Sequence, residues 1–289
     1  MIQPELKAYR RCSDRHVLVL ETNLTYVEKC QIFHYADLVR KAGNELTGIM
    51  KKRYDQLVRT KRYRKLKSLY KRYKDADNKK ALKDVCDQMK EMQKQYDVTW
   101  DYCRTSMIPI GKKYGIDAVF ALTKAEDVFR GIEKCLYSDG ETVHFKKRGD
   151  LPCIRAKQIN RGIIMKQMNF KFKNIEFGVN IKDRYEQEEV DAILYYLKHA
   201  EFMDSIAANT YKETDICVST YRPCYVSLVC KKIRGKLRVY VHITIEGVSK
   251  PKQDRFGNMK HNKGKGIVGC DIGTQTIAYT TETKVGLKN

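Results

Sequence analysis

The sequence predicts an α+β fold in which a long helical region is followed by a region rich in strands. No proline lies between Pro4 and Pro109, and apolar residues recur every three or four positions over residues 26–107. Further along, the period changes to the alternation typical of strands, first over residues 142–145 and again over residues 175–181. The chain therefore divides into a helical part and a β-rich part.

The helical part is preceded by one strand, which the apolar run of residues 15–22 predicts. The helical pattern of residues 26–107 continues over residues 112–138, with a break expected at Gly115. Two apolar stripes at helical spacing predict the core of a bundle; they contain Ile32, Tyr35, Ala36, Val39 and Leu46, and Val85, Met89, Met92, Tyr96 and Trp100.

The β-rich part contains one more helix, predicted over residues 186–209, and then two strong strands. These strands, residues 224–231 and 237–245, flank a turn that contains Gly235 and are expected to form a hairpin. The resulting division is residues 1–25 for the first strand, 26–138 for the helical region, 139–246 for the β-domain with its helix, 247–265 for a polar, glycine-rich linker, and 266–289 for the start of a last domain.

The charge of the chain predicts a polyanionic partner. Its 57 Lys and Arg exceed its 35 Asp and Glu by 22, and the isoelectric point is near 9.5. Each contact of a cation with a phosphate releases counterions, so nucleic acid is the partner that such a surplus favours. The expected class is thus a nucleic-acid-binding protein.

The densest charge lies between Lys51 and Lys74, where twelve Lys or Arg accompany a single acid, Asp55. On a helix these cations would repel one another without a counter-charge, which favours a surface that follows a nucleic-acid backbone. Tyrosines are interleaved with the cations, and tyrosine can stack on bases. The residues that we predict to bind here are Lys51, Lys52, Arg53, Arg62, Arg64, Lys65, Lys67 and Arg72.

A second basic segment begins the β-rich part. The residues from Phe145 to Asp150 read Phe-Lys-Lys-Arg-Gly-Asp, and more Lys and Arg follow. A basic, glycine-containing and β-rich stretch suits a groove for a nucleic-acid backbone. The predicted binding residues of this segment are Lys146, Lys147, Arg148, Arg155 and Lys157.

Near the end of the sequence, residues 266–281 predict a second hairpin with an acid, Asp271, at the end of its first strand. An acid so placed, with a glycine two residues later, suits a metal ion or a phosphate. The pattern Gly269-x-Asp271-x-Gly273 resembles the opening strand of the RuvC-like nuclease core, which has an RNase H-like fold. The pattern Asp271-x-Gly273-Thr274 is also similar to the phosphate-binding hairpin of sugar kinases and actin-like ATPases.

The position of this hairpin favours the nuclease, because the kinase hairpin opens its protein, whereas here about 265 residues precede it. The whole order, a strand, a basic helical insert, a small β-domain, a linker and then the hairpin, resembles TnpB-type transposon nucleases and the compact type V CRISPR effectors. At the level of residues the resemblance covers about 143–151 and 224–281. It implies a helical recognition lobe inserted in a small, wedge-like β-barrel, guide RNA and target DNA as partners, and a cytoplasmic, nucleoid-associated protein of a prokaryote.

The same resemblance implies cleavage of DNA by three carboxylates that hold two Mg²⁺ ions. Asp271 matches the first carboxylate, both as catalytic residue and as metal ligand, and the other two belong to later strands. We therefore expect a fragment, a truncated product or one half of a split protein, inactive without a C-terminal nuclease half. The ten cysteines contain no Cys-x-x-Cys pair, so no zinc site is readable, and no apolar run is long enough for a membrane span.

Two other functions stay open at this point. One is a nucleotide-binding phosphotransferase of the actin-like and sugar-kinase superfamily, which hydrolysis of ATP would indicate. The other is a plain basic RNA- or DNA-binding protein without a guide, which equal affinity for any polyanion would indicate.

Overall fold

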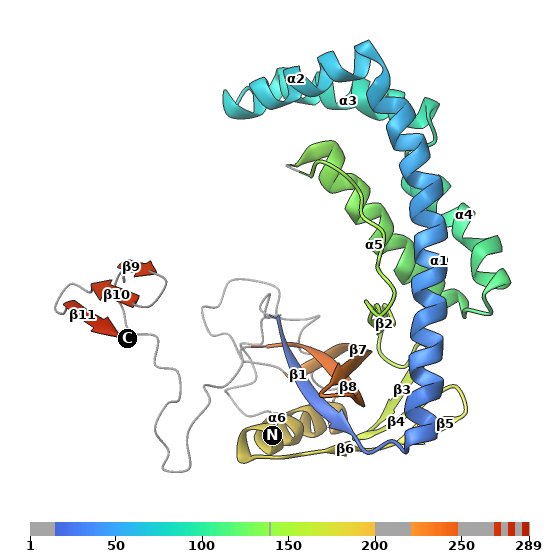
Figure 1. Cartoon of the computed structure of the whole chain (residues 1–289), viewed down its shortest axis with the longest axis vertical. Helices are drawn as coiled ribbons and strands as arrows, with labels where there is room; N and C mark the ends of the chain where they lie inside the picture. The colour runs from blue at the N-terminus through green and yellow to red at the C-terminus, as the bar shows by residue number, and fades with distance from the viewer. Residues whose placement is uncertain are drawn as a thin grey trace, which may run out of the picture. The chain divides into compact units, whose positions relative to one another are not determined.

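The computed structural model describes residues 15–138, 140–199 and 221–247, together with the backbone of three strands between residues 269 and 288 (Figure 1). The chain divides into two compact units, Met1–Val248 and Ser249–Asn289, and each is described by itself. The first unit contains helices and antiparallel sheets, which confirms the α+β class.

The region that the sequence predicts as continuous helix over residues 26–107 consists of four helices. Their boundaries lie where a side chain caps the next helix: Thr60, Asn78 and Thr99 each accept a hydrogen bond from a backbone N–H of the helix that follows. The helices of the described residues are α1 (Tyr26–Arg59), α2 (Lys61–Asp75), α3 (Lys79–Gln95), α4 (Trp100–Lys113), α5 (Ala118–Tyr137) and α6 (Arg184–Lys198).

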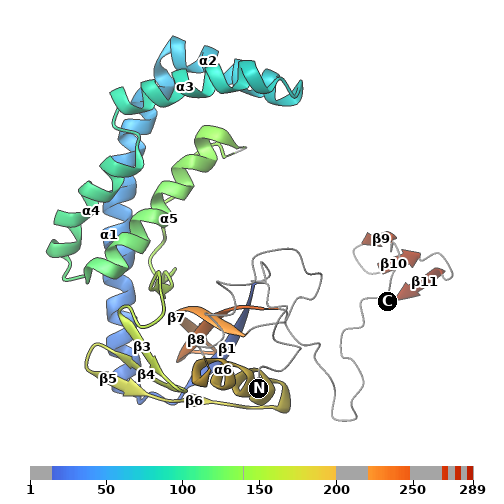
Figure 2. The same ribbon diagram turned by 180° about the vertical axis from the view of Figure 1, so that it is seen from behind.

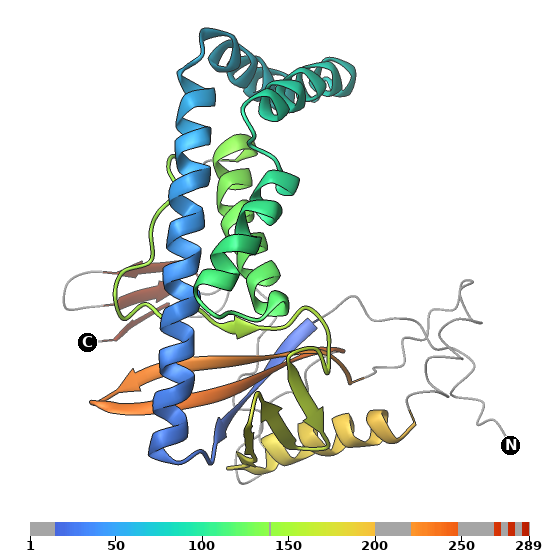
Figure 3. The ribbon, with the colours of Figure 1, turned by 90° about the vertical axis from the view of Figure 1, so that its right-hand side faces the viewer.

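Helix α1 is the longest element, with 34 residues, and it begins with a capping box between Thr25 and Glu28. Helices α4 and α5 lie along it, and α2 and α3 form an antiparallel pair beyond its C-terminal end (Figure 3). The first predicted stripe is the core face of α1, because Ile32, Ala36 and Leu46 are fully buried. In the second stripe, Val85, Met89 and Met92 of α3 are buried, whereas Tyr96 and Trp100 are half-buried. The break that Gly115 predicts is confirmed, since α4 ends at Lys113 and Gly115 has a φ of +63°.

The strands of the first unit form a five-stranded antiparallel sheet in the order β2-β7-β8-β1-β6 and a three-stranded sheet in the order β3-β4-β5 (Figure 2). Their bounds are β1 (Arg15–Thr22), β2 (Ile154–Arg155), β3 (Ile163–Lys166), β4 (Asn169–Phe172), β5 (Ile175–Phe177), β6 (Val179–Asn180), β7 (Arg222–Ile233) and β8 (Lys236–Glu246).

The predicted hairpin of β7 and β8 is confirmed. Two residues with positive φ, Arg234 and Gly235, join the strands, and this two-residue loop places Ile233 opposite Lys236. Alternate residues of β8, such as Val241 and Ile243, are fully buried. Leu20 of β1 lies opposite Val241, so β1 completes the same buried face although it is more than 200 residues away in the sequence.

Three parts of the β-domain differ from the prediction. Residues 142–145, predicted as a strand, are irregular chain that lies alongside α1 and α5. Helix α6 ends at Lys198, and residues 200–220 lie outside the described residues. The sheet of five strands is open between its edge strands β2 and β6, so the described residues contain no closed barrel.

The second unit contains the hairpin that residues 266–281 predict. Strand β9 (Gly269–Ile272) pairs with β10 (Ile277–Thr280), and Asp271 lies opposite Ala278. A further strand, β11 (Val285–Lys288), pairs with β10 on its other side. The predicted hairpin is therefore part of a three-stranded antiparallel meander, whose third strand, β11, was not predicted from the sequence.

Candidate nucleic-acid interface

Helix α2 carries eight Lys or Arg and one acid, Asp75, in 15 residues. Within the described part of the chain, none of these eight cations forms an ion pair. The helix nevertheless forms, because Thr60 caps its N-terminus and Tyr63 and Leu66 bury its apolar side. Its polar side is thus an exposed row of unneutralised positive charge.

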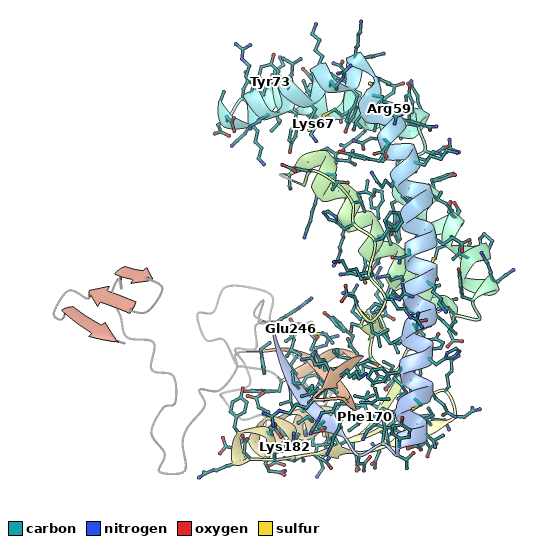
Figure 4. All side chains as sticks on the ribbon, in the orientation of Figure 1. Arg59, Lys67, Tyr73, Phe170, Lys182 and Glu246 are labelled. Atoms are coloured by element: carbon teal, nitrogen blue, oxygen red, sulfur yellow. The ribbon has the colours of Figure 1, made fainter. Side chains whose placement is uncertain are left out.

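Four of these cations line one hollow on the surface of α2, with a volume of about 740 Å³. We name Arg64, Lys67, Lys71 and Arg72 the basic face of α2. Lys67 is labelled in Figure 4, between Arg59 at the end of α1 and Tyr73 near the end of α2. Lys71 was not among the predicted binding residues, although it lies one helical turn after Lys67 and could have been found from that spacing.

Two of the four tyrosines interleaved with these cations are buried, so the expectation that they stack on bases does not hold for these two. Tyr63 is fully buried and Tyr54 is 6% exposed, and both belong to the core of the helical region. Burial raises the pKa of the Tyr63 hydroxyl far above its usual value, because the phenolate would lose its hydration. A side chain without access to solvent cannot stack on a base, so these two tyrosines contribute to the packing of the core instead.

Two contacts fix α2 to the C-terminal end of α5, and a third fixes the neighbouring helix α3 there. The Lys67 Nζ donates a hydrogen bond of 2.7 Å to the carbonyl oxygen of Cys135. The rings of Tyr70 and Tyr137 meet edge to face, with centroids 5.8 Å apart. Gln93 of α3 donates to the hydroxyl of Tyr137 over 2.8 Å. The basic face of α2 therefore stands on a packed support.

Four of the predicted binding residues are already neutralised by acids of the chain. Lys51 pairs with Asp55 on the same helix, and Arg53 pairs with Asp97. On the β-domain, Arg155 pairs with Asp127 over 3.0 Å, and Lys157 pairs with Glu126. These cations would have to give up their partners to meet a phosphate, and they are weaker candidates for that reason.

Of the other nine predicted cations, Lys67 is half-buried, and the remaining eight are exposed and form no ion pair within the described residues. Lys52, Arg62, Arg64, Lys65 and Arg72 lie on α1 and α2, and Lys146, Lys147 and Arg148 lie on the loop 140–153. Of these residues, Arg64 and Arg72 line the hollow on α2, and Lys146 lines a second cavity beside α1 and α5.

Helix α1 holds the loop 140–153 mainly by the side chain of Asn44, with a longer hydrogen bond of 3.4 Å from the Arg40 Nη1 to the carbonyl of Lys146. The Asn44 Oδ1 accepts a hydrogen bond from the backbone N–H of Lys146, and the Asn44 Nδ2 donates to the carbonyl of the same residue, both over 2.9 Å. Beyond this point the chain turns at Lys147–Asp150, with Gly149 at a φ of +96°. The amide of Asn44 thereby presents Lys147 and Arg148 on an anchored turn.

Replacing Asn44 with Ala is expected to release this loop. Both hydrogen bonds from Asn44 to the backbone of Lys146 would be lost, at a cost of about 1–2 kcal/mol in local stability, and the longer one from Arg40 would remain. Hydrogen exchange of the Lys146 amide should accelerate by a corresponding factor of about 5–30. Gln158→Ala, at an exposed position without such contacts, is the control. An unchanged exchange rate at Lys146 would show that Asn44 does not anchor the loop.

The expected metal ligand Asp271 lies in β9 of the second unit, paired in register with Ala278. Gly273 and Thr274, which complete the motif, lie outside the described residues. Among the described residues, no group of three or more His, Cys, Asp or Glu is arranged to hold a metal ion. Asp271 is therefore placed on a strand of a meander, and its partners stay a prediction.

Comparisons with known proteins do not assign the chain to a family. No family model matches it, and no curated protein matches it. In the part of the chain that the structure describes, no helix has both the length and the apolar character that crossing a membrane requires. The candidate interface therefore depends on the geometry and charge of α2 and of the loop 140–153.

Proposed function

We propose that this protein binds structured RNA through the basic face of α2 and the cations of the loop 140–153. The observation that carries the proposal is the absence of ion pairs for all eight cations of α2 within the described residues. Charges of one sign on one helix destabilise it unless an external anion neutralises them. A phosphate backbone supplies such anions at regular spacing.

We propose further that the chain is the recognition part of an RNA-guided DNA nuclease of the TnpB and type V effector kind. The support for this finer proposal is the resemblance of residues 143–151 and 224–281, and the β9–β10 hairpin that carries Asp271. In such a protein the guide RNA pairs with the target DNA, while the protein contacts the sugar-phosphate backbone of the resulting duplex. Asp271 would be the first carboxylate ligand of Mg²⁺, joined there by ligands from a nuclease half.

The purified chain is expected to bind an RNA hairpin more tightly than a DNA duplex of equal length. With about five phosphate contacts, the affinity for RNA should fall roughly a hundredfold between 50 and 200 mM salt, as measured by fluorescence anisotropy. Heparin serves as the control for charge alone. Equal affinity for RNA, DNA and heparin would contradict the RNA proposal and indicate a plain polyanion-binding protein. Affinity that barely changes with salt would contradict the role of the cations.

A further inference from the structure

A second cavity, of about 930 Å³, lies between α1, α5 and the loop 140–153. Asn44 and Thr47 line it from α1, and Val128 and Gly131 line it from α5. The loop forms one wall of this partly open cavity, because Asn44 holds the backbone of Lys146 against α1. Its volume is in the range of pockets that hold small molecules, which is about 300–1,000 Å³.

Lys124 of α5 is the buried charge of this cavity. Its side chain is only 8% exposed, and within the described residues it forms no hydrogen bond and no ion pair. Its stem lies across Gly43 of α1, where an added Cβ would stand 2.3 Å from the Lys124 Cε. The absence of a side chain at Gly43 therefore makes room for Lys124 to enter the cavity.

The other charges around Lys124 do not neutralise it. Asp127 also lines the cavity, but its carboxylate is paired with Arg155. Lys134 and Lys146 add two more cations to the lining, and Asp150 adds one exposed acid. Burial of the stem lowers the pKa of the Lys124 amine, because the ammonium has lost part of its hydration. The Lys124 Nζ is not among the described buried atoms that lack a hydrogen-bond partner, so it still reaches solvent, and an anion in the cavity could contact it there.

We propose that this cavity binds the phosphate group of a nucleotide, with the Lys124 ammonium as its main partner and Lys134 and Lys146 beside it. Phosphate is the anion whose charge and acceptor oxygens suit several ammonium groups at once. The rest of the cavity has room for the nucleoside. The nucleotide would be either free or the end of a bound RNA strand, and only the second source rests on the proposed function.

The test is titration calorimetry of the full chain with AMP, with inorganic phosphate and with an RNA strand that carries a terminal phosphate. Lys124→Met keeps the length of the stem and removes the charge. It is expected to weaken binding of at least one nucleotide probe by about tenfold to a hundredfold, the usual effect of losing a hydrogen bond to a charged group. Lys113→Met, at an exposed lysine paired with Glu45, is the matched control.

The two sources give different results. If the site takes a free nucleotide, AMP binds and Lys124→Met weakens it. If it takes a strand end, the RNA with a terminal phosphate binds more tightly than the same RNA without it, and Lys124→Met removes that difference. Binding of every probe that is unaffected by Lys124→Met would overturn the proposal. That result is distinct from failure of the proposed function, which would appear as RNA binding insensitive to the cations of α2.

A measurement on the wild-type chain covers the case in which Lys124→Met does not fold. Amines are acylated with acetic anhydride, with and without a saturating probe, and each lysine is quantified by mass spectrometry. Lys124 should be acylated at least about fivefold more slowly when AMP or the phosphorylated RNA is bound, whereas Lys113 should not change. Equal acylation of Lys124 with and without both probes would overturn the proposal.

Discussion

Replacing Arg64, Lys65, Lys71 and Arg72 of α2 together with Gln is expected to weaken binding of structured RNA by about a hundredfold at 0.15 M salt. Each phosphate contact contributes about 0.7 to the slope of log K against log salt, which is about fourfold in affinity at this salt concentration. None of the four cations has an ion-pair partner in the described part of the chain, so their full charge is available to the RNA. Gln has a helix propensity close to that of Lys and Arg, so α2 should keep its structure.

The matched control removes four charges that already have partners. Lys90, Lys113, Lys157 and Lys171 pair with Asp87, Glu45, Glu126 and Glu176, and their replacement by Gln lowers the net charge by the same amount. We expect this variant to lose less than tenfold in affinity. The slope with salt should fall by up to about 3 in the α2 variant and by much less in the control. Equal losses in the two variants would show that net charge alone binds RNA.

Replacing Tyr63 with Ala is expected to lower the free energy of unfolding by about 3–5 kcal/mol. The ring of Tyr63 is fully buried in the core that joins α2 to the rest of the helical region, and its loss leaves a cavity there. Denaturant unfolding followed by circular dichroism measures the change. Tyr63→Phe keeps the ring and loses only the long contact, 3.4 Å, with the Gln93 amide, so it should cost no more than about 1 kcal/mol.

The same two variants separate packing from base stacking. Tyr63→Phe should bind RNA as tightly as the wild-type chain, because the buried hydroxyl cannot reach a ligand. Tyr26→Ala, at an exposed tyrosine in the first turn of α1, is the control for stability and should change it by less than about 0.5 kcal/mol. A stable Tyr63→Ala variant that binds RNA poorly would contradict the burial of this ring and restore its role as a stacking residue.

Much of the fold could be predicted from patterns among residues that lie close together in the sequence. The hairpin of β7 and β8 was predictable because Gly235 permits a positive φ and because the strands alternate around it. The stripe that includes Ile32, Ala36 and Leu46 was predictable because helical spacing alone places these residues on one face. The division of the helical region was less visible, since the caps Thr60 and Asn78 are ordinary polar residues until their hydrogen bonds are seen.

The candidate site could likewise be predicted from the sequence only in part. The excess of cations between Lys51 and Lys74 was evident from composition, but which of them are free was not. Lys51 is neutralised by Asp55 one turn away, whereas Arg155 and Lys157 are neutralised by acids of α5 that the fold brings to them. Residues 142–145 alternate like a strand, yet none of the described strands pairs with them, and they pack over α1 and α5 instead.

By itself, the sequence determined the α+β class, the helical and strand periodicities and the positive charge of α2, because each depends on residues within a few turns or on composition. The tertiary structure alone decided that Tyr63 is core, that Asn44 anchors Lys146, and that Lys124 enters a cavity across Gly43. The physical reason is that burial and pairing are properties of contacts between distant segments. Such contacts depend on how whole elements pack, and no local pattern records them.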